Sequence, residues 1–232
     1  MKYQTDVNEV QAVIMAQLFL RGTLRFSEIN VIDVPSDQFS YHLRQLIKYG
    51  LVEKTEAGTY TLSVNGRSRA ILLDAKSNQF IEQGFVACRV ILAQEQAGVR
   101  RYLVQHRTKV PYQGNISEPG GKILFGEDVL VAARRNFLVE TGLECDMEVR
   151  GIVHFKDEYS ARIVQDKYFF VIWATNPRGD LLPKGETGEN AWMTLEEITT
   201  NPKTHQGVTD MIAIAEAGHF GFLEATHVTS EY

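Results

Sequence analysis

The sequence contains few cysteines and no long apolar segment. Its two cysteines, Cys88 and Cys145, are too far apart for a disulfide framework or the paired ligands of a zinc site, so we expect both to be buried as small apolar side chains. No apolar run approaches the roughly 20 residues of a membrane-spanning helix, and the first residues lack the basic start and apolar centre of a signal peptide. These absences predict a cytoplasmic protein with no membrane partner.

The sequence also lacks an excess of basic residues. The net charge is −5, from 24 Lys and Arg against 29 Asp and Glu. Residues 1–80 hold nine of the basic and eight of the acidic residues, which leaves 15 and 21 for the remainder. A nearly neutral part beside an acidic one favours two modules with different partners. Net charge alone does not indicate nucleic-acid binding, because a DNA-binding domain usually has a clearer basic excess.

The first 80 residues show a helical pattern that is followed by a short hairpin. Apolar residues at intervals of three and four predict an amphipathic helix over residues 7–20, which Gly22 ends. Further elements are expected as short helices at 26–29 and 65–71, a longer helix at 37–49, and strands at 51–54 and 59–62. This order resembles the winged helix-turn-helix domain, a small α+β fold.

The helix expected at 37–49 has two different faces. Phe39, Leu43 and Leu46 fall on one face, and polar residues fall on the other. The segment 39–52 resembles the recognition helix of bacterial winged helix-turn-helix repressors, in which the exposed face lies in the major groove and the wing contacts phosphates. The resemblance implies that the DNA contacts come from Tyr41, Arg44, Gln45, Lys48 and Lys54. The alternative is a winged helix that serves dimerisation or protein contacts.

From residue 85 the pattern changes to strands that surround helices. Strands are expected at 86–92, 101–105, 147–156 and 167–175, with helices at 127–140, at 195–198 and from about 208 onward. The polar stretch before this region predicts a linker. We therefore predict an N-terminal domain over 1–76, a linker over 77–84, and an α/β domain over 85–232.

One motif in the second domain is specific. Gly121 is followed after five residues by Glu127, after seven more by Arg135, and then by Glu140 and Gly142. These spacings, with Pro119 and Gly120 before them and Trp192 after them, resemble the signature of the Nudix family: Gly, five residues, Glu, seven residues, Arg-Glu-apolar-any-Glu-Glu-any-Gly-apolar. The resemblance implies a Nudix α/β/α sandwich that follows the winged-helix domain.

The signature helix normally carries carboxylates for metal binding. Cleavage of a pyrophosphate linkage requires neutralised phosphate oxygens and an activated water, which Mg²⁺ supplies while bound to carboxylates. Positions i, i+3 and i+4 of a helix share one face, and here they hold Asn136, Val139 and Glu140. Two of the three carboxylates are therefore missing, so we expect a weakened Mg²⁺ site, because ligand charge sets affinity at such sites.

The resemblance also assigns roles to the remaining residues. It implies metal binding by the backbone carbonyl of Gly120 and by Glu140 and Glu127, with Arg135 orienting the helix through a carboxylate. If the site is active, Glu140, Glu127 and Glu186 are the expected catalytic carboxylates.

Three functions remain open at this point. A winged helix beside a Nudix domain with a degenerate helix resembles Nudix-related repressors, which implies a homodimeric transcription regulator that binds DNA and an ADP-ribose-like nucleotide. The second is a Mg²⁺-dependent Nudix hydrolase of nucleoside diphosphate derivatives with an accessory N-terminal domain. The third is a module that binds protein or RNA and has neither activity.

Overall fold

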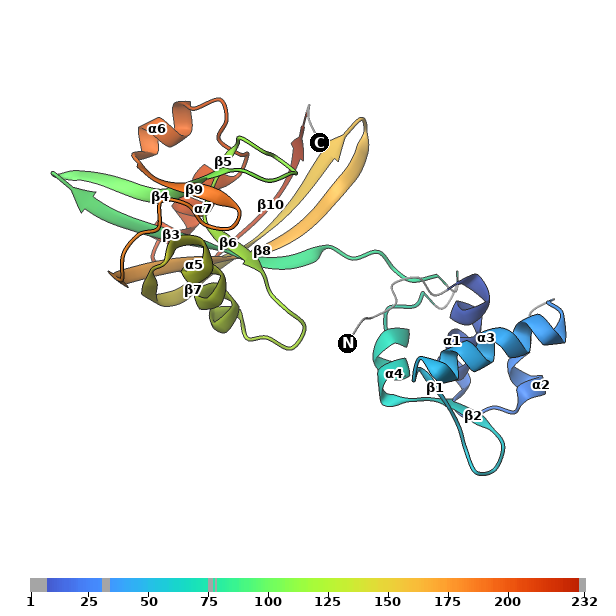
Figure 1. The fold of residues 1–232 in the computed structure, drawn as a ribbon. Helices are drawn as coiled ribbons and strands as arrows, with labels where there is room; N and C mark the ends of the chain where they lie inside the picture. The colour runs from blue at the N-terminus through green and yellow to red at the C-terminus, as the bar shows by residue number, and fades with distance from the viewer. Residues whose placement is uncertain (1–7, 31–33, 75–76, 78, 230–232) are drawn as a thin grey trace. The chain divides into compact units, whose positions relative to one another are not determined.

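The computed structural model describes residues 8–30, 34–74, 77 and 79–229 and divides the chain into two compact units, Met1–Glu82 and Gln83–Tyr232 (Figure 1). Residue 7, the first of the helix expected at 7–20, and residue 76, the last of the expected N-terminal domain, lie outside the described ranges. Within these ranges, every helix is too short or too polar to cross a membrane.

The N-terminal unit consists of helices packed on a two-stranded antiparallel sheet. Its elements in chain order are α1 Glu9–Arg21, α2 Phe26–Ile29, α3 Ser36–Lys48, β1 Val52–Lys54, β2 Tyr60–Leu62 and α4 Val64–Ala70. Asn8 caps the start of α1, and Gly22 ends it with a positive φ of 83°. The apolar face of α3 packs Phe39, Leu43 and Leu46 into the core of this unit. This order of elements fits a winged-helix-like domain.

Part of the segment expected as a linker packs against the N-terminal unit. Phe80 lies against the core of that unit, with the Arg69 guanidinium 5.0 Å from its ring centroid. The backbone N–H of Ile81 donates to the carbonyl of Leu72 at 2.7 Å. The chain therefore folds back on itself before it enters the second unit.

The C-terminal unit contains a mixed sheet with helices on both faces (Figure 1). Its strands are β3 Phe85–Gln96, β4 Val99–Arg107, β5 Ile116–Ser117, β6 Gly120–Lys122, β7 Glu144–Tyr159, β8 Arg162–Arg178, β9 Gly188–Met193 and β10 Gly221–Val228. Its helices are α5 Val129–Thr141, α6 Leu195–Thr200 and α7 Val208–Glu216. The sheet order is β10-β7-β8-β3-β4-β5, with β6 paired to β3 and β9 to β4.

Strand β3 pairs with different strands along its length. Along its first eight residues it pairs in parallel with β8, and residues 87–89 also pair with β6. Along its last four residues it pairs with β4 instead. Residues 87–89 of β3 therefore have β6 on one side and β8 on the other, whereas β4 is the partner of residues 93–96.

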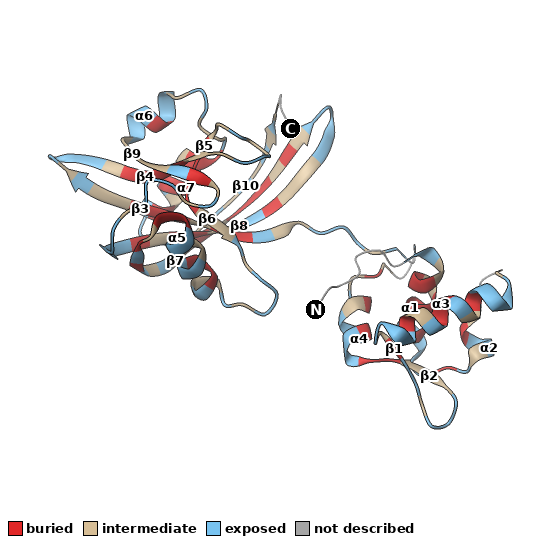
Figure 2. Ribbon diagram, in the orientation of Figure 1, coloured by how far each residue is buried: buried red, intermediate tan, exposed pale blue. Residues whose placement is uncertain are grey.

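Two apolar cores lie on opposite faces of this sheet, as the buried residues in Figure 2 show. On one face, α5 contributes Ala133 and Phe137, which pack with Cys88 and Cys145. On the other, α7 contributes Val208, Met211, Ile212 and Ala215. Both cysteines are buried, as predicted.

Four strands and one helix boundary differ from the sequence prediction, and the first of these strands is β9, Gly188–Met193. The pattern at 221–228 did not predict β10, which forms the edge of the sheet by parallel pairing with β7 over eight residues. The short β5 and β6 were also missed, since two or three residues carry no detectable periodicity. Helix α5 begins at Val129 rather than Glu127, because Glu127 closes a turn in which its backbone N–H donates to the carbonyl of Leu124.

Candidate functional site

Glu127 lies in the turn before α5 and is bound by Arg135. Its two carboxylate oxygens accept from Nε and Nη2 of Arg135, each at 2.7 Å, and one also accepts from the backbone N–H of Leu124 at 3.0 Å. The hydrogen bonds from Arg135 lower the pKa of Glu127 to about 2. The structure thus brings these two signature residues together, with Arg135 holding the start of the helix through a carboxylate.

The exposed face of α5 carries little charge where the signature expects carboxylates. The Asn136 side chain donates to the carbonyl of Lys122 at 3.1 Å and accepts from Arg135 at 3.1 Å. A Cβ at Gly121 would lie 2.4 Å from the Asn136 oxygen, so glycine permits this close contact. Val139 is 44% exposed and offers no ligand atom.

Glu140 is buried and fully hydrogen-bonded to protein groups. Only 5% of the residue is exposed. Oε1 accepts from the Thr187 hydroxyl at 2.8 Å, and Oε2 accepts from the Thr187 backbone N–H at 3.0 Å and from Nε2 of Gln105 at 3.1 Å. These bonds join α5 to β4 and to the loop before β9.

The other residues expected at the metal site lie in β6 and in the loop before β9. Gly120 begins β6, where it pairs with Arg89 of β3, and Glu186 is exposed in the loop before β9. No group of three or more His, Cys, Asp or Glu side chains in the described ranges is arranged to hold a metal ion.

A second group of polar side chains is linked by hydrogen bonds, ring contacts and charge interactions. We call it the polar cluster, and its members are Arg89, Arg107, Tyr112, Glu118, Asp157, Lys167, His205 and His227. They come from β3, β4, β7, β8, β10 and the loops around β5 and α7. Sequence reasoning did not identify them, since they are scattered over 139 positions with no common spacing.

Arg89 and Arg107 are half-buried cations within electrostatic range of each other. Burial, and then the positive charge of Arg89, lowers the pKa of Arg107, whereas Glu140 raises it. Arg89 lies 4.8 Å from the ring centroid of Phe169 and donates to the carbonyl of Glu118 at 3.2 Å. Neither guanidinium has an ion pair with any carboxylate in the described part of the chain. Two adjacent buried cations without such a partner favour the binding of an anion.

The remaining cation of the cluster is paired. The Lys167 ammonium donates to Oδ2 of Asp157, which also accepts from the Tyr112 hydroxyl, and both acidic and basic side chains are almost fully buried. Burial is the main cause of the lowered pKa of Lys167, and Arg89 and Arg107 lower it further. The Lys167–Asp157 pair is therefore neutral overall and lies within electrostatic range of the two arginines.

Aromatic rings surround this pair. The His205 ring meets the Tyr112 ring edge-on at 4.7 Å, and the His227 ring lies 4.6 Å from that of Phe155. Burial lowers the pKa of His205 to about 4, so this imidazole is neutral near pH 7. The cluster thus combines cationic groups with flat apolar surfaces.

Several buried atoms of the cluster lack a hydrogen-bond partner. They are both carboxylate oxygens of Glu118, Oδ1 of Asp157 and Nδ1 of His227. Glu118 is only 2% exposed, and burial raises its pKa to about 7, although Arg89 opposes the shift. Buried polar atoms without partners are costly, so their presence indicates a site built to receive polar groups from a ligand.

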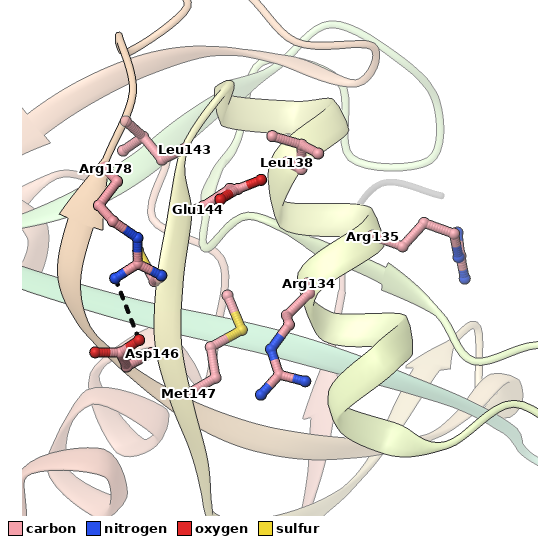
Figure 3. Close-up of a pocket in the computed structure, with 9 residues that line it drawn as sticks. Arg134, Arg135, Leu138, Leu143, Glu144, Asp146, Met147 and Arg178 are labelled. Carbon is pink, nitrogen blue, oxygen red and sulfur yellow. Dashed lines mark hydrogen bonds and ion pairs between the residues drawn. The ribbon is translucent and has the colours of Figure 1, made fainter.

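A pocket of about 330 Å³ lies elsewhere, between α5 and the start of β7 (Figure 3). Arg134, Leu138 and Met147 line it, together with Asp146, which pairs with Arg178 at 3.2 Å. The guanidinium of Arg135 points away from this pair (Figure 3). Because none of Glu127, Glu140 and Glu186 lines it, this pocket is separate from the expected metal site.

The candidate DNA-contacting residues of the N-terminal unit share a surface. Tyr41, Arg44 and Lys48 are exposed on one face of α3, and Gln45 beside them is half-buried. Lys54 on β1 is exposed and lies 5.8 Å from the centroid of the Tyr60 ring. In the described ranges, no carboxylate forms an ion pair with Arg44 or Lys48.

Comparison with known proteins identifies the C-terminal unit. The model of the NUDIX domain matches residues 85–213. The crystal structure of the mutator MutT protein from Bacillus halodurans superposes with a TM-score of 0.50 at 21% identity, covering 61% of this chain and 90% of that protein. The NUDIX domain of Shewanella oneidensis NrtR, complexed with ADP ribose, gives a TM-score of 0.50 at 15% identity, covering 58% and 88%. At these identities the two structures support the fold alone, and the α/β Nudix fold expected from the signature is confirmed.

Proposed function

Since the chain belongs to the NUDIX domain family, we propose that it is a ligand-responsive transcription regulator, whose C-terminal unit binds a nucleotide-type metabolite and whose N-terminal unit binds DNA. The observation that carries the ligand-binding part is the pair of half-buried guanidinium groups of Arg89 and Arg107 without a carboxylate partner in the described ranges. Guanidinium groups match phosphate oxygens in geometry and charge, and a diphosphate supplies enough negative charge for both.

The neighbouring groups suit the rest of a nucleotide. The two buried oxygens of Glu118, which lack a hydrogen-bond partner, can accept from hydroxyl or amino groups of a ligand. The rings of Tyr112 and His205 provide apolar surface of the kind on which a base or sugar packs. ADP-ribose is the first probe to use, because the NrtR domain was crystallised with it.

For the DNA-binding part, support comes from α3 and β1. In this proposal α3 is the recognition helix, with Tyr41, Arg44 and Lys48 exposed and Gln45 half-buried beside them, and the exposed Lys54 contacts phosphates from the wing. A homodimer is part of the proposal, because two recognition helices read a symmetric site. A ligand that binds one dimer arrangement better than another shifts the population and so changes the spacing between these helices.

The test is retardation of DNA from the region upstream of the protein's own coding sequence, at low salt, with and without ADP-ribose. We expect binding that ADP-ribose changes. Arg44→Ala is expected to weaken binding about tenfold, whereas the matched Arg25→Ala, also exposed but outside the α3 face, leaves it unchanged. Failure to retard any such DNA without ligand excludes the regulator.

The alternative is a Mg²⁺-dependent hydrolase of nucleoside diphosphate derivatives. One observation favours it: the spacing of the signature is intact, and Arg135 binds Glu127 as the family resemblance implies. Phosphate release from a panel of nucleoside diphosphate derivatives decides between the two. Rapid turnover that Glu140→Gln abolishes establishes the hydrolase, and turnover no faster than that variant excludes it.

A further inference from the structure

We infer that the C-terminal unit binds its anionic ligand without a divalent cation, with Glu140 acting as a structural residue and Arg89 and Arg107 supplying the positive charge. This inference rests on the proposed ligand binding and adds how the charge of the ligand is neutralised. The reason lies in the contacts that each signature residue makes in this chain.

Protein donors occupy three of the roughly four acceptor positions of the Glu140 carboxylate, two on Oε2 and one on Oε1. Its three hydrogen bonds, two from Thr187 and one from Gln105, are all to protein groups. To bind Mg²⁺, Glu140 would have to break bonds that a charged acceptor makes strong. The donor groups of Thr187 and Gln105 would then lack an acceptor beside a buried side chain. Leaving buried donors without acceptors costs stability.

The backbone around Glu140 also leaves little space. A Cβ at Gly185 would lie 2.5 Å from Oε2 of Glu140 and 2.3 Å from its carbonyl oxygen. The loop that carries Thr187 is therefore packed directly on the carboxylate. Mg²⁺ usually keeps several of its waters, and a hydrated ion does not fit against so close a cover.

The other signature positions do not replace the missing charge. Glu127 is held by both Arg135 and the backbone of Leu124, and Asn136 is hydrogen-bonded to Lys122 and Arg135. Val139 has no ligand atom, and Glu186 is an exposed carboxylate on the loop before β9. A single exposed carboxylate supplies too little charge to hold a hard dication tightly.

Positive charge is instead present in the polar cluster. Arg107 lies within electrostatic range of both Glu140 and Arg89, so the arginine pair begins beside the signature helix. Asp157 balances the charge of the nearby Lys167, so the two arginines supply the net positive charge. These groups can perform the charge neutralisation for which the family signature uses a metal, and the guanidinium groups add directed donors that a metal lacks.

Calorimetry with ADP-ribose tests the inference on the full chain. We expect the Kd in EDTA and in excess MgCl₂ to differ by less than about threefold, and Arg107→Gln to weaken binding about thirtyfold in both. The matched control is Arg134→Gln, an arginine of the same unit that lines the separate pocket, and it leaves the Kd unchanged. Thermal unfolding of each variant shows that it is folded. Binding that needs MgCl₂ overturns the inference and leaves the proposed ligand binding intact.

Two further titrations separate the inference from the proposed function when ADP-ribose does not bind in either buffer. The first is MgCl₂ alone: saturable uptake by the wild type that Glu140→Gln removes overturns the inference, and its absence supports it. The second is inorganic pyrophosphate in EDTA: binding that Arg107→Gln weakens supports the inference, and no binding overturns it. In that case lack of ADP-ribose binding counts only against the choice of nucleotide in the proposed function.

Discussion

The signature helix and the polar cluster of the same unit differ in whether their charged groups have protein partners. Glu140 on the helix and Glu127 in the turn before it accept hydrogen bonds from protein donors through both carboxylate oxygens. In the cluster, Arg89 and Arg107 lack carboxylate partners in the described ranges, and Glu118 has two unpartnered oxygens. Satisfied polar groups contribute to stability, whereas unsatisfied buried groups cost stability and are retained where a ligand completes them. This difference is the reason why we propose that the ligand binds in the cluster rather than on the helix.

The largest expected effect on the free energy of unfolding comes from replacing Glu140, whose carboxylate is hydrogen-bonded to protein donors. Glu140→Ala removes the acceptor for three donors and leaves a cavity, so we expect the free energy of unfolding to fall by about 4 kcal/mol. Urea unfolding followed by tryptophan fluorescence measures it, because Trp173 and Trp192, the two tryptophans of the chain, are both in the C-terminal unit. The exposed Glu186→Ala is the control and changes little; a loss below about 1 kcal/mol for Glu140→Ala contradicts the structural role.

Replacing Glu118, which lacks hydrogen-bond partners, is expected to raise the free energy of unfolding at neutral pH. Burial raises the pKa of Glu118 to about 7 from the ordinary 4.5, so the folded state favours the protonated acid. The contribution of Glu118 to the free energy of unfolding is fully present below pH 4.5. It is lost as the pH rises through 7, a decline on the order of 3 kcal/mol. Glu118→Gln removes this decline, so we expect the variant to gain stability over the wild type as the pH rises from 4.5 to 8. Parallel curves for the two proteins across this range would show that Glu118 titrates normally.

A smaller effect is expected at the edge of the cluster. Tyr112→Phe removes the hydroxyl that donates to Asp157, while Lys167 still pairs with that carboxylate. We expect a loss of about 1 kcal/mol in the free energy of unfolding. Tyr168→Phe, whose ring stacks on His154, is the control and loses less. Equal losses would mean that the hydroxyl of Tyr112 contributes nothing specific.

The smallest effect is expected where a signature carboxylate is restored. Val139→Glu changes an exposed residue, so the stability should change by less than about 0.5 kcal/mol. Because Glu140 stays bound to Thr187 and Gln105, one added carboxylate should not create a Mg²⁺ site. Thermal unfolding with and without MgCl₂ measures both effects. A clear stabilisation by MgCl₂ in this variant alone would show that Glu140 can still turn toward a metal.

The sequence predicted those features that depend on residues near one another along the chain. Gly22 and Gly142 end helices where the pattern placed their ends, and the signature spacing placed Arg135 within reach of Glu127. The loss of charge on α5 was also visible, since it depends only on the identities of Asn136 and Val139.

The polar cluster could not be predicted in this way. Arg89 and Lys167 come together because β3 and β8 pair in parallel, a contact between segments 78 residues apart that no local spacing encodes. Glu118 carried the one local signal, a carboxylate directly before Pro119 and Gly120 of the signature. Whether such a residue is buried depends on the pairing of β5 and β6, which are too short to detect in a single sequence.

The parallel pairing of β10 with β7 has a consequence for synthesis on the ribosome. Residues 221–228 are the last strand described, yet they cover the edge of a strand that begins at Glu144. The nascent domain therefore exposes the open edge of β7 until these residues have emerged, and an exposed edge is a template for pairing with other chains. During this interval His154 also lacks Glu224, which bonds to it at 3.1 Å in the finished sheet.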